Sequence, residues 1–220
     1  MLTDAINNDI KIVKHADKCL VYERPLSPAG LKWVDLAKWW QETQGLPDLK
    51  AARKSLGERL RESVRRTLSV PEHALFKTYY EVFGPALGDQ LPALIPQVYL
   101  HYDPQTLVQR GGRRVLLRQR MDFLMLLEGS VRIVLEVDGK HHYAQGEIAS
   151  PTLYAEMVRE DRALRLGGYE VYRFGGPEFP DSQPIGDRQV VGSQSGAVVV
   201  EFFTDLFRRH GISVHSNVTV

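Results

Sequence analysis

The feature that most constrains this fold is a pair of apolar segments separated by a short polar break. Residues 115–127 and 131–138 are rich in Val, Ile, Leu, Met and Phe, which favour β-strands, and the break at 128–130 is typical of a hairpin turn. From position 131 onward odd and even positions differ in polarity, which indicates a strand with two different faces. Glu136 and Asp138 are therefore predicted to share one face near the end of that strand.

Helices and further strands are predicted on either side of this hairpin. Ser69 can cap a helix that starts at position 70, with Glu72 as its partner in a capping box, and Gly84-Pro85 should stop that helix. The other predicted elements are a strand at 97–102, a helix at 150–166, a strand at 169–174, a loop at 175–196 and a final helix or strand-to-helix element at 197–209.

This order of elements predicts the fold class. A helix, three strands, a helix, a strand and a helix over residues 69–220 indicate an α/β domain on a mixed sheet flanked by helices. Residues 1–68 are predicted to be a mostly helical N-terminal extension, with amphipathic helices at 31–44 and 48–67. We therefore expect two units, 1–68 and 69–220.

Composition excludes several classes of protein. With 43% hydrophobic and 25% charged residues in 220, the chain is not expected to be disordered or fibrous. It has no apolar run near the roughly 18 residues that a membrane helix needs, and its N-terminus lacks the layout of a signal peptide. Cys19 is the one cysteine, which argues against a disulfide and a thiolate zinc site. We expect a cytoplasmic protein with no membrane partner.

Basic residues gather in two places although the net charge is only +1. Residues 50–66 contain seven basic and two acidic residues, and a second cluster contains no acid between its members. Such patches are typical of surfaces that bind a phosphate backbone, so nucleic acid is a predicted partner. The alternative for either patch alone is a solvated helix face or an arginine-rich hairpin. The second cluster comprises Arg110, Arg113, Arg114, Arg118 and Arg120.

An acid inside an apolar strand needs a partner, and Asp122 lies in the apolar run 121–127. If the two strands pair as a hairpin, Asp122 is only about 5 Å across from Glu136 or Asp138. Neighbouring carboxylates repel, so a proton, a basic side chain or a cation must compensate. Clustered oxygen ligands suit Mg²⁺ or Mn²⁺, which can activate water for attack on a phosphodiester, and Lys140 can orient that water.

Several of these residues also have a purely structural interpretation. Asp138 precedes a glycine, and the pair is a common turn dipeptide. Glu72 can serve only as the capping partner of Ser69. His141 and His142 can be surface residues, and a zinc site built from this adjacent pair is not expected.

A buried ion pair is the structural alternative for the two strand acids. Asp122 and Glu136 can be held by arginines such as Arg118 or Arg173. In that case the acids would stabilise the fold and carry no chemistry.

Several segments, taken in order, resemble those of a known nuclease superfamily. Asp122-Phe123 lies in an apolar strand, residues 135–143 contain Glu-x-Asp-Gly-x-x-His, and residues 160–174 contain Gly-Tyr-x-Val-x-Arg. Together they resemble the PD-(D/E)xK restriction-endonuclease-like superfamily, closest to the branch of very-short-patch-repair endonucleases and related bacterial domains. The resemblance covers about residues 69–176, and residues 1–68 show no such match.

The resemblance implies a core of a helix, a three-stranded meander, a helix and a further strand, in agreement with the predicted order of elements. It also implies that Asp122 and Glu136 bind Mg²⁺ or Mn²⁺, with Glu72 as an additional acid from the first helix. The family's lysine, two residues after the acid, is replaced here by Asp138. Either Asp138 is a third metal ligand, or Lys140 supplies the ammonium group from a shifted position.

The resemblance further implies a function. His142 matches a histidine of the branch and would position water or phosphate, while Asp161 and Arg162 would bind each other or anchor their helix to the sheet. We therefore expect a Mg²⁺-dependent DNA endonuclease of bacterial restriction, phage defence or repair, acting as a homodimer or within a larger complex. The alternatives are an inactive nuclease-like module that binds nucleic acid or a protein, and an unrelated α/β interaction protein.

Overall fold

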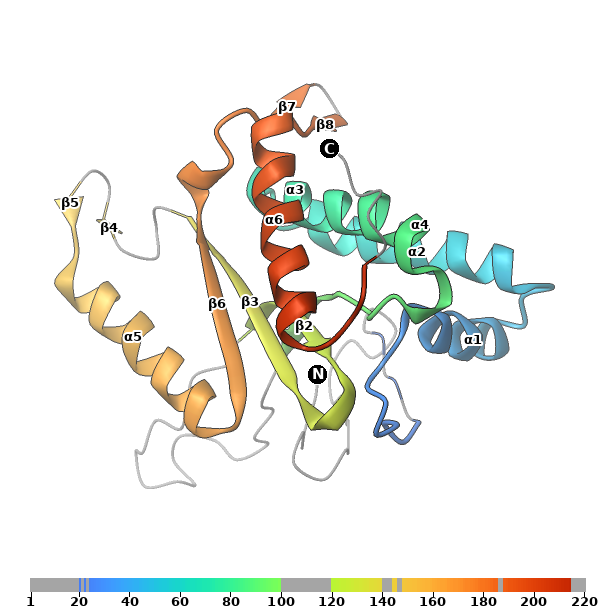
Figure 1. Cartoon of the computed structure of the whole chain (residues 1–220). Helices are drawn as coiled ribbons and strands as arrows, with labels where there is room; N and C mark the ends of the chain where they lie inside the picture. Colours follow the sequence, from blue (N-terminus) through green and yellow to red (C-terminus); the bar gives the residue numbers. More distant parts are fainter. Residues whose placement is uncertain are drawn as a thin grey trace, which may run out of the picture.

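The centre of the molecule is a four-stranded sheet made of β1 (Ile95–Tyr99), β2 (Arg120–Leu126), β3 (Arg132–Asp138) and β6 (Tyr169–Gly175), in that order (Figure 1). The computed structural model describes residues 20, 22, 24–99, 120–139, 144–145, 148–185 and 188–214. β1 pairs with β2 and β2 with β3 in antiparallel fashion, whereas β3 and β6 are parallel. The predicted α/β class with a mixed sheet is therefore confirmed.

The predicted hairpin is formed by β2 and β3. A short 3₁₀ turn, η4 (Glu128–Ser130), joins them, and Gly129 adopts a φ of 73° there, a conformation that glycine accepts without a Cβ clash. Ile133 and Leu135 pack into the main hydrophobic core, while Val134 joins a smaller cluster on the opposite face of the sheet. The alternation seen in the sequence thus corresponds to two buried faces.

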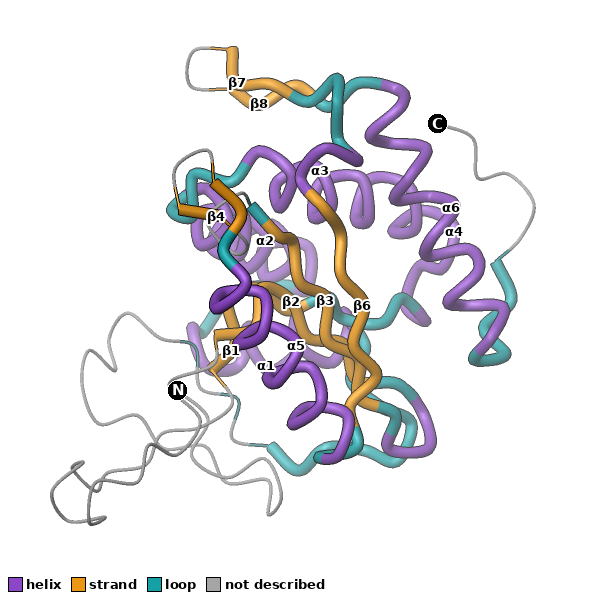
Figure 2. The backbone as a smooth tube through the Cα atoms, turned by 90° about the vertical axis from the view of Figure 1, so that its left-hand side faces the viewer, coloured by secondary structure: helices purple, strands orange, loops and turns teal. Residues whose placement is uncertain are grey.

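Helices cover both faces of the sheet (Figures 1 and 2). One face carries α5 (Pro151–Leu166), of which Leu164 is the buried residue. The other face is covered by helices from the two ends of the chain, which are α1 (Trp33–Gln44), α2 (Leu49–Arg65), α3 (Val70–Thr78) and α6 (Ser193–Arg209).

Local signals set the ends of the first two helices. α1 ends at Gly45, which has a φ of 61°, and the Asp48 carboxylate caps α2 by accepting a 2.7 Å hydrogen bond from a backbone N–H of the first turn. The helices predicted at 31–44 and 48–67 agree with these bounds to within two residues.

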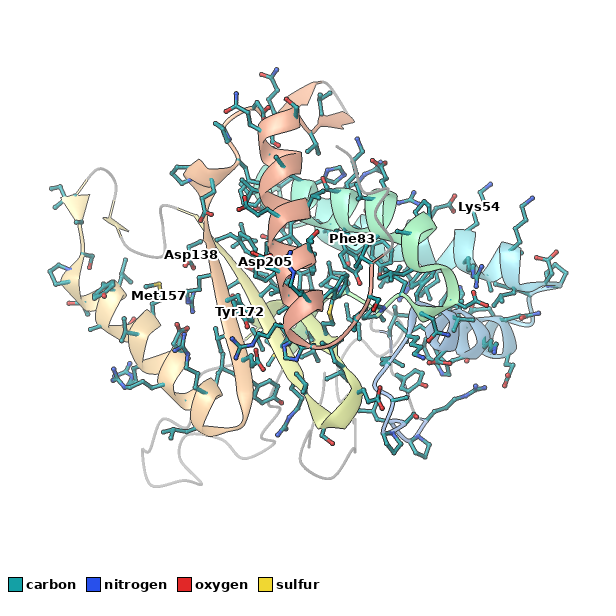
Figure 3. The ribbon with its side chains drawn as sticks, in the orientation of Figure 1. Lys54, Phe83, Asp138, Met157, Tyr172 and Asp205 are labelled. Atoms are coloured by element: carbon teal, nitrogen blue, oxygen red, sulfur yellow. The ribbon has the colours of Figure 1, made fainter. Side chains whose placement is uncertain are left out.

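The first two helices share a hydrophobic core with the sheet. Trp39 of α1 and Leu56 of α2 belong to the same buried cluster as Phe123 of β2 and Phe203 of α6. Phe83 is fully buried in this cluster, between the helices on that side of the sheet (Figure 3).

The helix that starts at position 70 does not stop at Gly84-Pro85, so this prediction was wrong by about one turn. α3 continues into a π-helical turn, η2 (Tyr79–Phe83), then into α4 (Gly84–Leu87) and a 3₁₀ turn, η3 (Gly88–Gln90). Pro85 lies in the first turn of α4, directly after the π-helical turn, a helix position that tolerates proline. Gly84-Pro85 is therefore tolerated at the point where the π-helical turn meets α4.

The loop predicted at 175–196 contains short regular elements instead. A 3₁₀ turn follows β6, and a two-stranded hairpin follows that turn; a second small hairpin precedes α5. These elements are η6 (Gly176–Glu178), β7 (Gln183–Ile185), β8 (Arg188–Val190), β4 (Ala144–Gln145) and β5 (Ile148–Ala149). None of the helices in the described part combines the length and apolar composition needed to cross a membrane.

The last helix begins earlier than predicted, at Ser193 instead of position 197. Its first turn is capped from outside the helix, because the Asp181 carboxylate accepts hydrogen bonds of 2.9 Å from the backbone N–H groups of Gln194 and Ser195. A cap supplied from twelve residues upstream of Ser193 is not visible in the local pattern.

Candidate functional site

Two carboxylates face one another on β2 and β3. The antiparallel register pairs Phe123 with Leu135. The next pair toward the open end of the hairpin is therefore Asp122 opposite Glu136. Both acids are buried, with 6% and 7% of their surface exposed. Asp122 Oδ2 accepts a 2.9 Å hydrogen bond from the backbone N–H of Val137, which holds this carboxylate at the end of the hairpin. The hairpin thus brings the two acids together, as the sequence predicts.

The surroundings of Glu136 disfavour its ionised form. Burial raises its pKa well above the usual 4.5, and the charge of Asp122 raises this pKa further. Arg173 acts in the opposite direction, while Asp138 and Asp161 again raise the pKa. Glu136 is therefore a group that gains from a proton or from an added cation.

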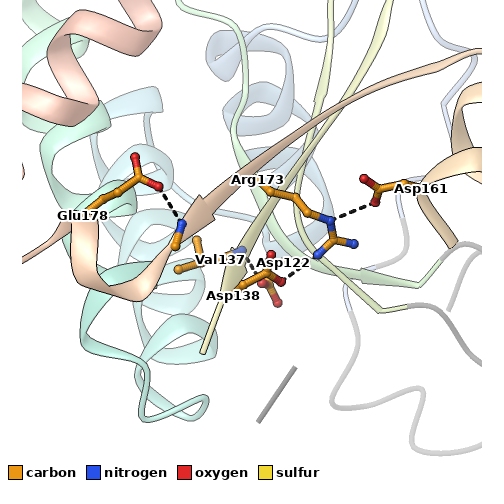
Figure 4. Close-up of polar contacts among 7 residues, drawn as sticks. Asp122, Val137, Asp138, Asp161, Arg173 and Glu178 are labelled. Carbon is orange, nitrogen blue, oxygen red and sulfur yellow. Dashed lines mark hydrogen bonds and ion pairs between the residues drawn. The ribbon is translucent and has the colours of Figure 1, made fainter. Parts of the chain in front are cut away.

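Arg173 joins the acids of the sheet to those of α5. Its Nη1 lies 2.6 Å from Asp138 Oδ1 and its Nε lies 2.8 Å from Asp161 Oδ1, as Figure 4 shows. The parallel register places Arg173 beside Glu136 on the neighbouring strand. Asp138 is the last residue of β3, and residues 140–143, which would complete a turn after it, lie outside the described residues. Asp161 anchors α5 to the sheet, one of the two roles expected for it.

Glu72 reaches the same region from α3. It is 5% exposed, and its Oε2 accepts a 2.8 Å hydrogen bond from Gln97 Nε2. The other half of the expected capping box does not form, since the Ser69 N–H donates to Thr67 Oγ1. The Ser69 hydroxyl does accept a hydrogen bond from the Glu72 N–H, at 3.3 Å. Glu72 is therefore more than a capping residue.

Gln97 has an unusual backbone conformation next to the acids. Its φ of 57° lies in the left-handed region, although it is within a strand. The β1–β2 register pairs Pro96 with Phe123 and Val98 with Met121, so Gln97 lies opposite position 122. Strained residues of this kind concentrate at functional sites. Nothing in the sequence marks this position, because glutamine carries no signal for positive φ.

The chemistry of the donors fits a divalent cation only in part. Asp122 and Glu136 provide hard oxygen donors from adjacent strands, as Mg²⁺ or Mn²⁺ requires. Asp138, however, is engaged by Arg173. In the described part of the chain, no group of three or more His, Cys, Asp or Glu side chains is arranged to hold a metal ion. Lys140 and His142 lie outside the described residues.

Of the two basic segments, residues 50–66 belong to the described part of the chain, and of the second cluster only the backbone of Arg120 does. Arg120 is the first residue of β2, with its backbone opposite Tyr99, and its side chain is not described. The basic residues at 50–66 are described and lie on or beside α2. The other members of the arginine cluster lie outside the described residues. They are Arg110, Arg113, Arg114 and Arg118.

Comparison with protein-family models, with curated proteins and with solved structures found no match for this chain.

Proposed function

We propose that this protein is a metal-dependent nuclease that hydrolyses phosphodiester bonds of nucleic acid, with DNA as the substrate. The observation that carries the proposal is the buried pair of opposed carboxylates, Asp122 and Glu136. Two such acids stabilise a fold poorly without a proton or a cation, because each disfavours the charge of the other. Bacterial restriction, phage defence or repair is the proposed context, with a homodimer or a larger complex as the acting form.

The proposal gives each residue a separate task. Asp122 and Glu136 hold Mg²⁺ or Mn²⁺, which supplies Lewis acidity toward a phosphate oxygen and toward water. Asp138 is a third ligand, which requires that its carboxylate leave Arg173 and bind the ion. Glu72 contributes a further carboxylate from α3. Lys140 and His142, outside the described residues, are proposed to orient water and phosphate.

A second candidate function rests on the Arg173 bridge. With Asp138 held by Arg173, the carboxyl ends of β3 and β6 already have compensated charge without a metal. This arrangement favours a nuclease-like module that binds nucleic acid or a protein partner and does not cut. It predicts binding of duplex with no cleavage in any divalent metal.

A cleavage assay tests the proposal. The full chain is incubated with supercoiled plasmid, linear duplex, single-stranded DNA and RNA, each with Mg²⁺, Mn²⁺ or EDTA. We expect cutting that needs the metal and falls about 100-fold or more in Asp122→Asn and Glu136→Gln. Asp205→Asn is the matched control, because Asp205 is an exposed carboxylate on α6, 62% exposed and paired with Arg208. Cutting that survives both site substitutions would contradict the proposal, as would intact substrates throughout.

A further inference from the structure

A basic surface lies where α2 and α3 pack against one another. Arg61 and Arg65 are four residues apart on α2, and His73 and Lys77 are four residues apart on α3. Side chains at this spacing lie on the same face of a helix. The charges of Lys77, Arg65 and Arg61 all act on His73, and after burial they are what lowers its pKa. Because α2 and α3 pack against one another, the three cations lie on neighbouring helices.

The positive charge on this surface is poorly compensated. Arg61 and Arg65 are exposed, and neither has an acidic partner within ion-pair distance among the described residues. Lys77 has only a long contact, 3.9 Å, to the exposed Glu81. His73 is 7% exposed, and its Nδ1 is buried without a hydrogen-bond partner in the described part of the chain. Such a surface gains free energy by binding an anion.

Two other arginines on or beside α2 do have acidic partners. Arg66 pairs with Glu62 at 3.1 Å, and Arg53 is bonded to Asp89. Each of these two arginines thus has an acidic partner within the fold. The Arg66 pair is local, four residues apart along the helix, whereas Arg53 reaches an acid of η3 across the fold.

The uncompensated set extends along α2. Lys54, Arg61 and Arg65 follow one another at seven and four positions, which places them on one stripe of the helix, together with the acid Glu58. Lys54 projects outward from α2 in Figure 3. From Lys54 to Arg65 the helix rises by about 16 Å. The stripe is therefore long enough to follow several phosphates of one strand.

This surface is linked to the acids through α3 and the edge strand β1. His73 directly follows Glu72, and Glu72 accepts a hydrogen bond from Gln97, which lies opposite Asp122. The link between this surface and the carboxylates therefore runs from Glu72 through Gln97 to β2.

We propose that Arg61, Arg65 and Lys77 bind the phosphate backbone of the nucleic acid on which the acidic site acts. This inference rests on the proposed function and assigns its backbone-binding surface. Arginine suits the task because its planar guanidinium donates two parallel hydrogen bonds to a phosphate. Since the surface binds phosphate, it contributes affinity and no sequence preference.

Binding measured without catalysis tests the surface. Fluorescence anisotropy of a labelled duplex is followed in EDTA from low to moderate salt, with the full chain carrying Glu136→Gln so that no substrate is cut. Adding Arg61→Gln and Arg65→Gln should weaken binding about tenfold or more. The salt slope should fall by about 1.8, because two phosphates of the duplex are no longer neutralised by the protein. Arg61→Lys with Arg65→Lys should retain most of the affinity.

The matched control removes two positive charges from the paired set. Arg53→Gln with Arg66→Gln should change affinity by no more than about twofold. Equal weakening in both double variants would show an effect of net charge alone and would overturn the proposed binding surface. Unchanged binding in Arg61→Gln/Arg65→Gln would overturn it as well. Displacement of the duplex by polyglutamate at equal charge concentration would assign the surface to acidic proteins instead. Thermal midpoints of all variants exclude unfolding as the cause.

The two proposals can fail separately. If Arg61→Gln/Arg65→Gln weakens binding and the wild-type chain cuts nothing, the binding surface is supported and the catalytic proposal is refuted. If cutting depends on Asp122 and Glu136 but KM is unchanged in Arg61→Gln/Arg65→Gln, the nuclease stands and the surface falls.

Discussion

The carboxyl group of Glu136 makes stability depend on pH. Its pKa is raised in the folded protein, first by burial and then by Asp122, above the 4.5 of an unfolded chain. Between these two values the folded state holds a proton that the unfolded state releases, so stability falls as the pH rises. The contribution is fully present below 4.5 and is lost as the pH passes the raised pKa.

We therefore predict that Glu136→Gln is more stable than the wild-type chain at pH 8 in EDTA, by about 0.5–2 kcal/mol. The free energy of unfolding, measured by urea titration across pH 4 to 9, checks this. Glu201→Gln, an exposed glutamate of α6, is the control and should follow the wild-type curve. Adding Mg²⁺ should raise the stability of the wild-type chain and not that of Glu136→Gln. A pH profile unchanged by Glu136→Gln would contradict the prediction.

Arg173 stabilises the fold because it neutralises two acids that are largely removed from water. The side chains of Arg173, Asp138 and Asp161 are 17%, 11% and 22% exposed. Arg173→Met leaves both acids without this partner, and we expect a loss of about 3 kcal/mol. For a chain of this size that corresponds to a fall in Tm of about 6–12 °C, measurable by calorimetry.

The control for this substitution is an exposed ion pair. Arg208→Met breaks the contact between Arg208 and Asp205 on α6, whose side chains are 73% and 62% exposed. Such pairs contribute about 0.5 kcal/mol or less. Equal effects of Arg173→Met and Arg208→Met would mean that the bridge between β3, β6 and α5 does not stabilise the fold.

At the scale of elements, α2 carries a glycine in its interior and α1 ends on another. Gly57 has no positive φ, and an added Cβ would meet only Arg61 Nη2, at an ordinary 3.5 Å. Gly45 has a φ of 61°, which disfavours any residue with a Cβ. Gly57→Ala should therefore stabilise the protein by about 0.5–1 kcal/mol, and Gly45→Ala should destabilise it by about 1 kcal/mol. Paired calorimetric measurements check this, and shifts of the same sign would refute it.

At the scale of the whole molecule, the helices before Ser69 and the sheet after it share one hydrophobic core. All three tryptophans, Trp33, Trp39 and Trp40, lie in α1. Tryptophan fluorescence therefore reports on the N-terminal part alone, whereas far-ultraviolet circular dichroism reports on the whole chain. A shared core predicts that the two signals change at the same urea concentration. An earlier transition in fluorescence would show that residues 1–68 unfold as a separate unit.

Much of the fold could be predicted because its signals are local. The alternation at 131–138 and the polar break at 128–130 specify the β2–β3 hairpin, since strand period and turn chemistry act over a few residues. That hairpin alone brings Asp122 opposite Glu136. The caps at Asp48 and Gly45 are equally local, and the helix bounds that they set agree with the sequence.

The sequence by itself thus determined the α/β order of elements and the pairing of the two buried acids. Only the tertiary structure decided that Arg173 holds Asp138 and Asp161, that Gln97 adopts a positive φ beside Glu72, and that Arg53 of α2 pairs with Asp89. Each of these features depends on packing between elements far apart in the chain. Neither periodicity nor composition records such packing, because its free energy arises only when the elements meet.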